Sequence, residues 1–343
     1  MVRGKRAAGV LTGAVAFALL AGACGGDSSS TVPGGNGTGD GAESGAIVIS
    51  GSSTVEPISS LVAELFQDAN PDVTITVEGP GTGDGFELFC AGEIDISDAS
   101  RPIEDDEAKN CEKAGVDYVE LEVALDGLTV MTSPANEAVT CLNLGDLYAL
   151  LGPESEGFST WSDADALANE VGGTDSFPDT SLDVTGPGEE SGTYDAMIDL
   201  AGIEDTAIGR DVPEDEAAAL RPDYQSSPND NIIIQGIEGS DSSLGWVGFA
   251  YAQNAGEGVK ELEIDGGGGC VAPTYESISD ASYPLSRSLY IYVNTEKAAE
   301  NAALSAYVDY YLSDEGITAV AEAGYVDLPA DRLEAARTAW SGV

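Results

Sequence analysis

The sequence predicts an α/β protein with two lobes. Short runs with the alternation of strands are repeatedly followed by stretches in which apolar residues recur every three or four positions, as they do along one face of a helix. This order is typical of parallel sheets with helices on their faces. The chain has 343 residues, 42% of them hydrophobic, which is enough for two lobes with separate cores.

The first third of the chain alternates strand and helix. Residues 46–50 form a short apolar strand, and Pro57 is expected at the first position of a helix whose apolar face continues to Phe66. Residues 73–77 alternate as a strand, and the element after the next turn opens with Phe86. The other predicted elements are strands at 118–121, 128–132, 182–185, 245–251 and 289–293, a helix capped by Ser191, and helices at 229–237 and 298–312.

The N-terminus has the pattern of an export signal over residues 1–23. Basic residues precede an apolar run over 7–21, and small residues lead to Cys24. The run is too short for a comfortable membrane span. Cys24 resembles a lipobox cysteine, although Ala21 stands where leucine is usual, so a lipid anchor is predicted there. Residues 24–45 are rich in Gly, Ser, Thr, Asn and Asp, which predicts a flexible tether. We therefore expect an extracytoplasmic protein anchored to the cell membrane.

Composition excludes several classes of function. The formal net charge is −48, so nucleic acid is not an expected partner, and contact with a membrane is expected only through the lipid anchor. The chain has no histidine, which excludes a Ser-His-Asp triad and the commonest metal ligands. A P-loop is absent, and the acidic runs at 104–107 and 213–216 lack EF-hand spacing. We predict a protein that is not an enzyme and holds no metal or cofactor.

Four cysteines remain after Cys24, an even number in an exported chain. This favours two disulfides over buried free thiols. We predict that Cys90 pairs with Cys111, closing a local loop, and that Cys141 pairs with Cys270, joining the ends of a middle segment.

Four turns rich in glycine and hydroxyl side chains lie where predicted strands end, at 51–55, 79–85, 95–101 and 186–193. Such turns leave backbone N–H groups free at a helix N-terminus, where the peptide dipoles favour an anion. For a turn taken alone, ordinary helix capping is the favoured explanation. Several in one chain favour a shared oxyanion site in one crevice.

The turns supply the candidate ligands. Ser100 is a donor, and Arg101 offers a guanidinium fork suited to a tetrahedral oxyanion, although a surface ion pair explains Arg101 equally well. Asp98 is a candidate proton acceptor. The remaining candidates are Thr54 and the N–H of Val55, Thr82, Ser191, Gly192 and Thr193.

Five motifs follow one another in a fixed order. They are Gly-Ser-Ser-Thr-Val at 51–55, Gly-Thr-Gly-Asp-Gly at 81–85, Asp-Ile-Ser-Asp-Ala-Ser-Arg-Pro-Ile at 95–103, Leu-Asp-Gly-Leu-Thr-Val at 125–130 and Gly-Pro-Gly-Glu-Glu-Ser-Gly-Thr-Tyr-Asp at 186–195. This ordered set resembles the phosphate-binding lipoproteins of the PstS family over nearly the whole mature chain. Further similar segments lie at 230–236, 245–251 and 284–287.

The resemblance implies a two-lobed, periplasmic-binding-protein-like fold of type II, with a ligand cleft between the lobes. Such a protein closes over one inorganic phosphate and delivers it to the permease subunits of an ABC transporter. The candidate ligands above would contact the phosphate. One lobe would comprise residues 46–124 and 288–343, and the other residues 125–287.

Two positions depart from the family pattern. Members often carry aspartate where this chain has Ser100, and arginine where it has Pro187. Arg101 would then supply the positive charge, and Asp98 the acceptor.

Three other functions stay open from the sequence. The same fold could bind another oxyanion such as sulfate or molybdate. A secreted hydrolase of phosphate esters would need a nucleophile or metal site that the motifs do not provide. A structural or adhesive surface protein is favoured only by the acidity and the tether.

Overall fold

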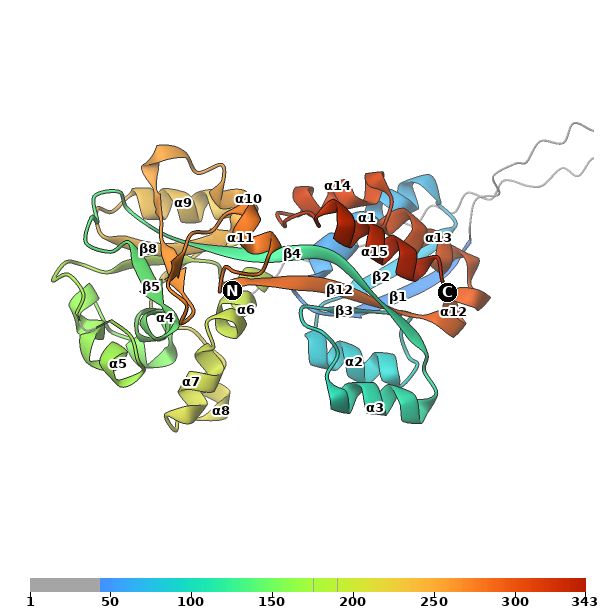
Figure 1. Cartoon of the computed structure of the whole chain (residues 1–343), viewed down its shortest axis with the longest axis horizontal. Coiled ribbons are helices and arrows are strands. Elements are labelled where there is room, and N and C mark those ends of the chain that lie inside the picture. Colours follow the sequence, from blue (N-terminus) through green and yellow to red (C-terminus); the bar gives the residue numbers. More distant parts are fainter. Residues whose placement is uncertain (1–43, 175, 190) are drawn as a thin grey trace, which may run out of the picture. The chain divides into compact units, whose positions relative to one another are not determined.

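A mixed sheet of nine strands runs through the part of the chain that the structure describes (Figure 1). The computed structural model describes residues 44–343 apart from 175 and 190. The predicted signal peptide, Cys24 and the tether up to residue 43 lie outside the described residues. The strand order is β2 (Val73–Glu78), β1 (Gly45–Gly51), β3 (Ile96–Ala99), β12 (Ser286–Asn294), β4 (Tyr118–Thr132), β8 (Ser243–Gly248), β6 (Asp183–Gly186) and β7 (Gln225–Ser226), with β9 (Lys260–Glu261) paired to β4.

A second sheet has three short strands. Their order is β11 (Cys270–Val271), β10 (Glu263–Asp265) and β5 (Cys141–Asn143). The helices are α1 (Glu56–Ala69), α2 (Thr82–Cys90), α3 (Asp105–Ala114), α4 (Leu144–Leu151), α5 (Asp165–Glu170), α6 (Gly192–Leu200), α7 (Ile203–Gly209), α8 (Glu214–Ala217), α9 (Asp230–Glu238), α10 (Phe249–Ala252), α11 (Tyr275–Ser279), α12 (Thr295–Glu300), α13 (Ala302–Tyr311), α14 (Asp314–Glu322) and α15 (Ala330–Trp340).

Strands β1 and β2 lead into the first two predicted turns, whereas β3 occupies residues 96–99 of the third predicted turn, so only its last residues form a turn. β1 pairs in parallel with both β2 and β3, as the alternation of strand and helix predicts. Their carboxyl ends therefore lie at one edge of the sheet, and the turns that follow them gather there. β12 and β4 run antiparallel to their neighbours, so the sheet is mixed rather than wholly parallel.

β4 is one strand of 15 residues, where the sequence predicts two strands separated by residues 122–127. It pairs with β12 up to Gly127 and with β8 from Leu128 onward. Charged residues cause the predicted gap, because Glu122 and Asp126 do not look like residues of an inner strand. Their charges are paired with Arg332 and Arg287, which lie far away in the sequence, so the strand continues through them.

Two other predicted elements are divided. The strand predicted at 245–251 ends at Gly248, and α10 takes up its last residues. The helix predicted at 298–312 is broken at Asn301, whose side chain caps α13 by accepting a hydrogen bond from the N–H of Ala303. An asparagine that competes with the backbone in this way ends one helix and starts the next.

Two large hydrophobic clusters lie along the sheet. One is built from β1, α1, α13, α14 and the first part of β4. The other is built from the later part of β4 together with α4, α6 and β8. β4 therefore contributes side chains to both clusters.

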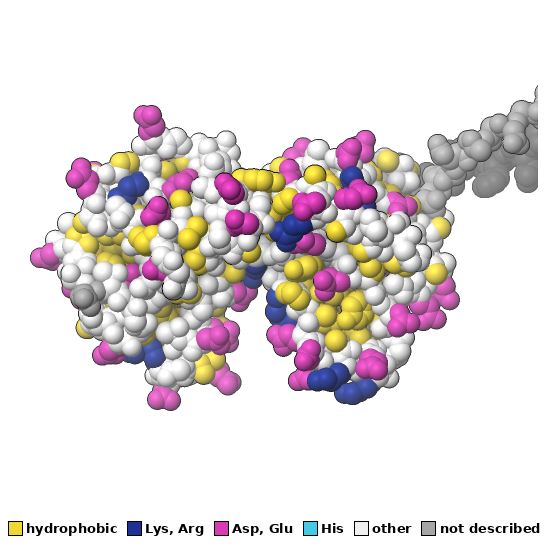
Figure 2. Space-filling view, in the orientation of Figure 1, with side chains coloured by type: hydrophobic (Ala, Val, Ile, Leu, Met, Phe, Trp, Pro, Cys, Tyr) yellow, Lys and Arg dark blue, Asp and Glu magenta, His cyan; other side chains and the backbone are white. Residues whose placement is uncertain are grey.

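Both predicted disulfides are present. Cys90 is bonded to Cys111 and joins α2 to α3, and Cys141 is bonded to Cys270 and joins β5 to β11. The predicted pairing is thus confirmed. Acidic side chains far outnumber basic ones on the face shown in Figure 2, in keeping with the net charge. Within the described residues, no helix combines the length and apolar character needed to cross a bilayer.

Candidate functional site

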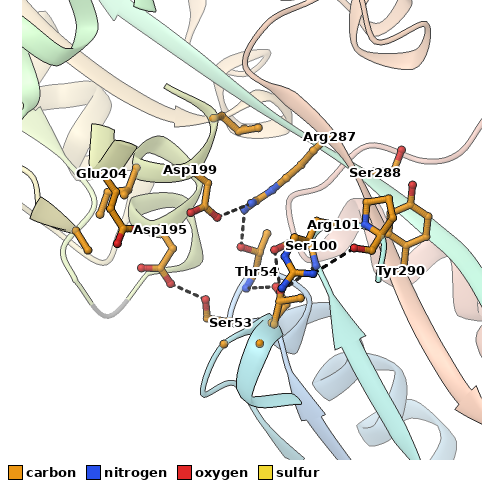
Figure 3. Close-up of a pocket in the computed structure, with 18 of the residues that line it drawn as sticks. Ser53, Thr54, Ser100, Arg101, Asp195, Asp199, Glu204, Arg287, Ser288 and Tyr290 are labelled. Carbon is orange, nitrogen blue, oxygen red and sulfur yellow. Dashed lines mark hydrogen bonds and ion pairs between the residues drawn. The ribbon is translucent and has the colours of Figure 1, made fainter. Parts of the chain in front are cut away.

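A cavity of about 720 Å³ lies at the edge of the sheet where β1, β2 and β3 end (Figure 3). The turns after these strands form one wall, with Ser52, Ser53 and Thr54 from the first of them. The facing wall comes from α6 and the start of α7, and β12 contributes Arg287. The parallel pairing of the three strands places their turns together, which is the position at which α/β sheets commonly bind ligands.

Thr54 joins three parts of the site. Its hydroxyl donates to the carbonyl of Gly192 over 3.2 Å and accepts from Nη2 of Arg287 over 2.9 Å. Gly192 is required at this contact, because a Cβ there would lie only 2.7 Å from the Cα of Thr54. The structure therefore brings the first and fourth predicted turns into direct contact.

Thr82 and Ser100 join the second and third turns. Their hydroxyl oxygens are 3.1 Å apart, and the N–H of Ser100 donates to the hydroxyl of Thr82 over 3.2 Å. Both residues line the cavity. Gly81 precedes Thr82 with a φ of 127°, a conformation that glycine adopts without strain. Two of the predicted hydroxyl donors thus lie side by side.

Arg101 lines the cavity, but its guanidinium fork is occupied. Nη1 and Nη2 each donate to a carboxylate oxygen of Glu107 over 2.8 Å, and Nε lies 3.4 Å from Glu104. The hydrogen bond with Glu107 is the main cause that raises the pKa of Arg101. The guanidinium also lies over the ring of Phe86. Arg101 therefore forms the ion pair that the sequence left open as the alternative to anion binding.

Arg287 is the basic residue that the sequence interpretation missed. Its side chain extends between α6 and the first turn (Figure 3), where Nη2 donates to Thr54, Nη1 donates to Asp199 over 2.8 Å, and Nε lies 3.3 Å from Asp126. Burial raises the pKa of Asp126, and Arg287 opposes this shift. A signal existed, since only 13 basic residues occur in the chain and Arg287 ends one of the segments that resemble the PstS family.

The wall formed by α6 and α7 is acidic. Asp195, Asp199, Glu204 and Asp205 all line the cavity. Asp195 accepts a hydrogen bond from the hydroxyl of Ser53 over 2.5 Å. Burial raises the pKa of the Asp195 carboxyl, and the hydrogen bond from Ser53 lowers it. The sequence interpretation gave none of these four residues a role in the site, although Asp195 ends the motif at 186–195, because an acid in so acidic a chain is not distinctive.

Several predicted residues do not line the cavity. The N–H of Val55 donates to the carbonyl of Ser52 over 3.1 Å, inside the first turn. Ser191 caps α6, as predicted, and accepts from the N–H of Thr193 over 3.2 Å. The fourth turn thus reaches the cavity wall through the carbonyl of Gly192 on Thr54.

Asp98 lies beneath the site rather than in it. Its side chain is completely buried, and Oδ1 accepts a hydrogen bond from the hydroxyl of Ser59 over 3.0 Å. Oδ2 has no hydrogen-bond partner within the described part of the chain. Burial raises the pKa of Asp98 to about 8. The structure therefore does not bring Asp98 to the cavity, where a proton acceptor for a ligand would have to lie.

Metal binding finds no support in the same region. Among residues 44–174, 176–189 and 191–343, no group of three or more cysteine, aspartate or glutamate side chains is arranged to hold a metal ion. The chemistry available to the cavity is that of hydroxyl and guanidinium donors together with the carboxylates of the facing wall.

The fold and the cavity at its strand ends define a periplasmic binding protein of type II. Residues 36–315 match the model of the PBP superfamily domain. The chain is 39% identical over 286 residues to protein SphX of Synechocystis, covering 83% of this chain and 79% of that protein. It is 32% identical over 319 residues to the phosphate-binding protein PstS of Staphylococcus saprophyticus, covering 93% of this chain and 89% of that protein.

A solved structure agrees with these relatives. The crystal structure of a possible phosphate binding protein from Planctomyces limnophilus superposes with a TM-score of 0.78 at 36% identity, covering 88% of this chain and 99% of that chain. The chain therefore belongs to the PBP superfamily and, within it, to the PstS family.

Proposed function

We propose that this protein binds inorganic phosphate outside the cytoplasmic membrane and delivers it to the permease subunits of an ABC transporter. One observation carries the proposal: hydroxyl donors from three separate turns line one cavity beside the guanidinium of Arg287. A tetrahedral oxyanion accepts hydrogen bonds in several directions at once, and this arrangement of donors suits it. The relatives named above as phosphate-binding proteins support the same ligand.

The proposed phosphate contacts are the donors that face the cavity. They are Ser53, Thr54, Thr82, Ser100 and Arg287. Arg101 contributes its positive charge at the cavity wall, while its fork stays with Glu107. Contacts from Val55, Ser191, Gly192 and Thr193 stay a prediction from the family motif.

The division into two lobes is part of the proposal. Leu125 pairs with Ser288, and Asp126 with Arg287, where β4 and β12 run side by side. The predicted boundaries at 124/125 and 287/288 thus face each other across one pair of strands. The two large hydrophobic clusters support separate cores on either side of this crossing. A cavity of this size exceeds a single phosphate ion, so we propose that the lobes close over it.

The anchor and the location belong to the same proposal. The export pattern over residues 1–23 and the cysteine at position 24 support lipidation at the membrane. The two disulfides support an oxidising compartment.

Isothermal titration of the purified protein with phosphate, arsenate and sulfate tests the proposed function. We expect saturable binding of phosphate and arsenate. Sulfate keeps two negative charges at neutral pH, whereas part of the phosphate is the monoanion, so the acidic wall repels sulfate more strongly and we expect it to compete weakly. Absence of phosphate binding would contradict the proposal, and equal binding of sulfate would point to a general oxyanion receptor.

A further inference from the structure

Two carboxylates of α6 occupy donors that the proposed function assigns to phosphate (Figure 3). Asp195 accepts from the hydroxyl of Ser53 over 2.5 Å. Asp199 accepts from Nη1 of Arg287 over 2.8 Å. A carboxylate oxygen and a phosphate oxygen are both anionic acceptors, so they accept hydrogen bonds from the same donors.

These contacts are specific to two of the four acids on the wall. Glu204 and Asp205 line the same cavity, yet within the described residues neither side chain forms a hydrogen bond or ion pair with the donors. Asp195 and Asp199 are therefore distinguished by what they contact and not by charge alone. Their partners lie 142 and 88 positions away in the sequence, so the contacts join segments that only the fold brings together.

Phosphate cannot accept hydrogen bonds from the hydroxyl of Ser53 and from Nη1 of Arg287 while the two carboxylates accept them. An incoming oxyanion at Thr54 would share the guanidinium of Arg287 with Asp199 and would face a second negative charge at Asp195. Like charges this close repel each other, and the repulsion is larger in a partly enclosed site than in water.

Resting on the proposed function, we propose that Asp195 and Asp199 are an intramolecular competitor of the ligand. They hold α6 against the first turn when no phosphate is bound, and they leave Ser53 and Arg287 when phosphate enters. The two carboxylates therefore lower the affinity for phosphate and set the phosphate concentration at which half of the protein is occupied.

The sign of a substitution distinguishes this proposal from its opposite. If the two carboxylates compete with phosphate, their loss makes binding tighter. If instead they help to clamp the lobes around bound phosphate, their loss makes binding weaker. Neither substitution leaves a charge buried without a partner, because Arg287 keeps Asp126 and Asp199 is 55% exposed.

The experiment is phosphate titration of the parent protein and the variants Asp195→Asn and Asp199→Asn at one pH and one salt concentration. Each substitution is expected to lower Kd about two- to fivefold, because a single polar contact at a partly exposed site contributes little net free energy. The matched control is Glu204→Gln, which removes one negative charge from the same wall without removing a contact. Its Kd is expected to change less than about twofold.

Three results would overturn the proposal. Unchanged or weaker binding by both asparagine variants would show that the carboxylates do not compete. Equal tightening by Glu204→Gln would show that only the total charge of the wall matters. A parent protein that takes up no phosphate would refute the proposed function itself, which the first two results leave standing.

Discussion

Arg287 organises the cavity through three contacts that its place in the sequence does not indicate. Its guanidinium touches a buried acid of β4, an acid of α6 and the hydroxyl of Thr54. Arg101 looked more prominent because it stands inside a motif. The structure shows the difference between them, since the fork of Arg101 is held by Glu107 of the neighbouring helix α3, whereas the guanidinium of Arg287 reaches Thr54 in the cavity.

We predict that Arg287→Lys weakens phosphate binding about tenfold with little change in fold. Lysine keeps the positive charge but cannot reach three partners with a planar fork. Titration of this variant beside Arg101→Lys provides the comparison, and the second variant is expected to change Kd less than about twofold. A larger loss of phosphate affinity in Arg101→Lys than in Arg287→Lys would show that Arg101 is the basic residue that binds phosphate.

A second pair of variants compares the first turn with the fourth. Thr54→Val removes a hydroxyl that lines the cavity, so phosphate binding should weaken roughly ten- to hundredfold, the worth of a hydrogen bond to a charged group. The family motif predicts a loss for Thr193→Val too, whereas the lining of the cavity predicts a smaller one. Equal losses in titration would place the fourth turn in contact with phosphate.

At the scale of the elements, local patterns predicted most strands and helices, and long-range partners account for the differences. β1, β2 and α9 lie within one or two residues of their predicted bounds, because alternation and helical spacing are local properties. The sequence predicts two strands in place of β4, because the arginines that pair with Glu122 and Asp126 lie 210 and 161 positions away. The acids of α6 carry no local signal either, because an acidic residue is not distinctive in so acidic a chain.

The candidate site follows the same rule. Hydroxyl turns at strand ends were predictable, because turn chemistry is written in short motifs and parallel strands bring their ends together. The sequence does not indicate which hydroxyl faces the cavity and which only caps a helix. Ser191 is an example, because its hydroxyl accepts from the N–H of Thr193 within the same turn. The sequence does not indicate the burial of Asp98 either, because the hydrogen bond that it accepts comes from Ser59 on α1, 39 positions away.

The two disulfides close loops of very different length, which leads to a prediction on stability. Cys90 and Cys111 are 21 positions apart, and Cys141 and Cys270 are 129 apart. If each disulfide acts mainly on the unfolded chain, replacing both cysteines by alanine costs about 3 kcal/mol for the short loop and about 5 kcal/mol for the long one. Urea denaturation of the two double variants measures this order. A larger loss for the short loop would show that packing around the buried Cys111 outweighs loop entropy.

At the scale of the whole molecule, the free energy of unfolding depends on pH, and the raised pKa of Asp98 gives the sign of one contribution. Asp98 is enclosed by α1, β3 and α13, and the ionisable groups that face it are Glu56, Tyr307 and Tyr311. Burial of the carboxyl, with a smaller contribution from Glu56, favours its neutral form. The folded protein therefore keeps a proton that the unfolded chain releases.

We predict that this contribution to stability declines as the pH rises from about 4 to about 8. The pKa of Asp98 is about 8 in the folded protein and near 3.9 in an unfolded chain. Between these values the folded state binds more protons, so the free energy of unfolding falls by at most about 1.4 kcal/mol per pH unit. Asp98→Asn keeps an acceptor for Ser59 and removes the titration. The variant should therefore gain stability relative to the parent at each step from pH 5 to pH 8 in urea denaturation. A difference that stays constant over this range would mean that Asp98 is ionised in the folded protein.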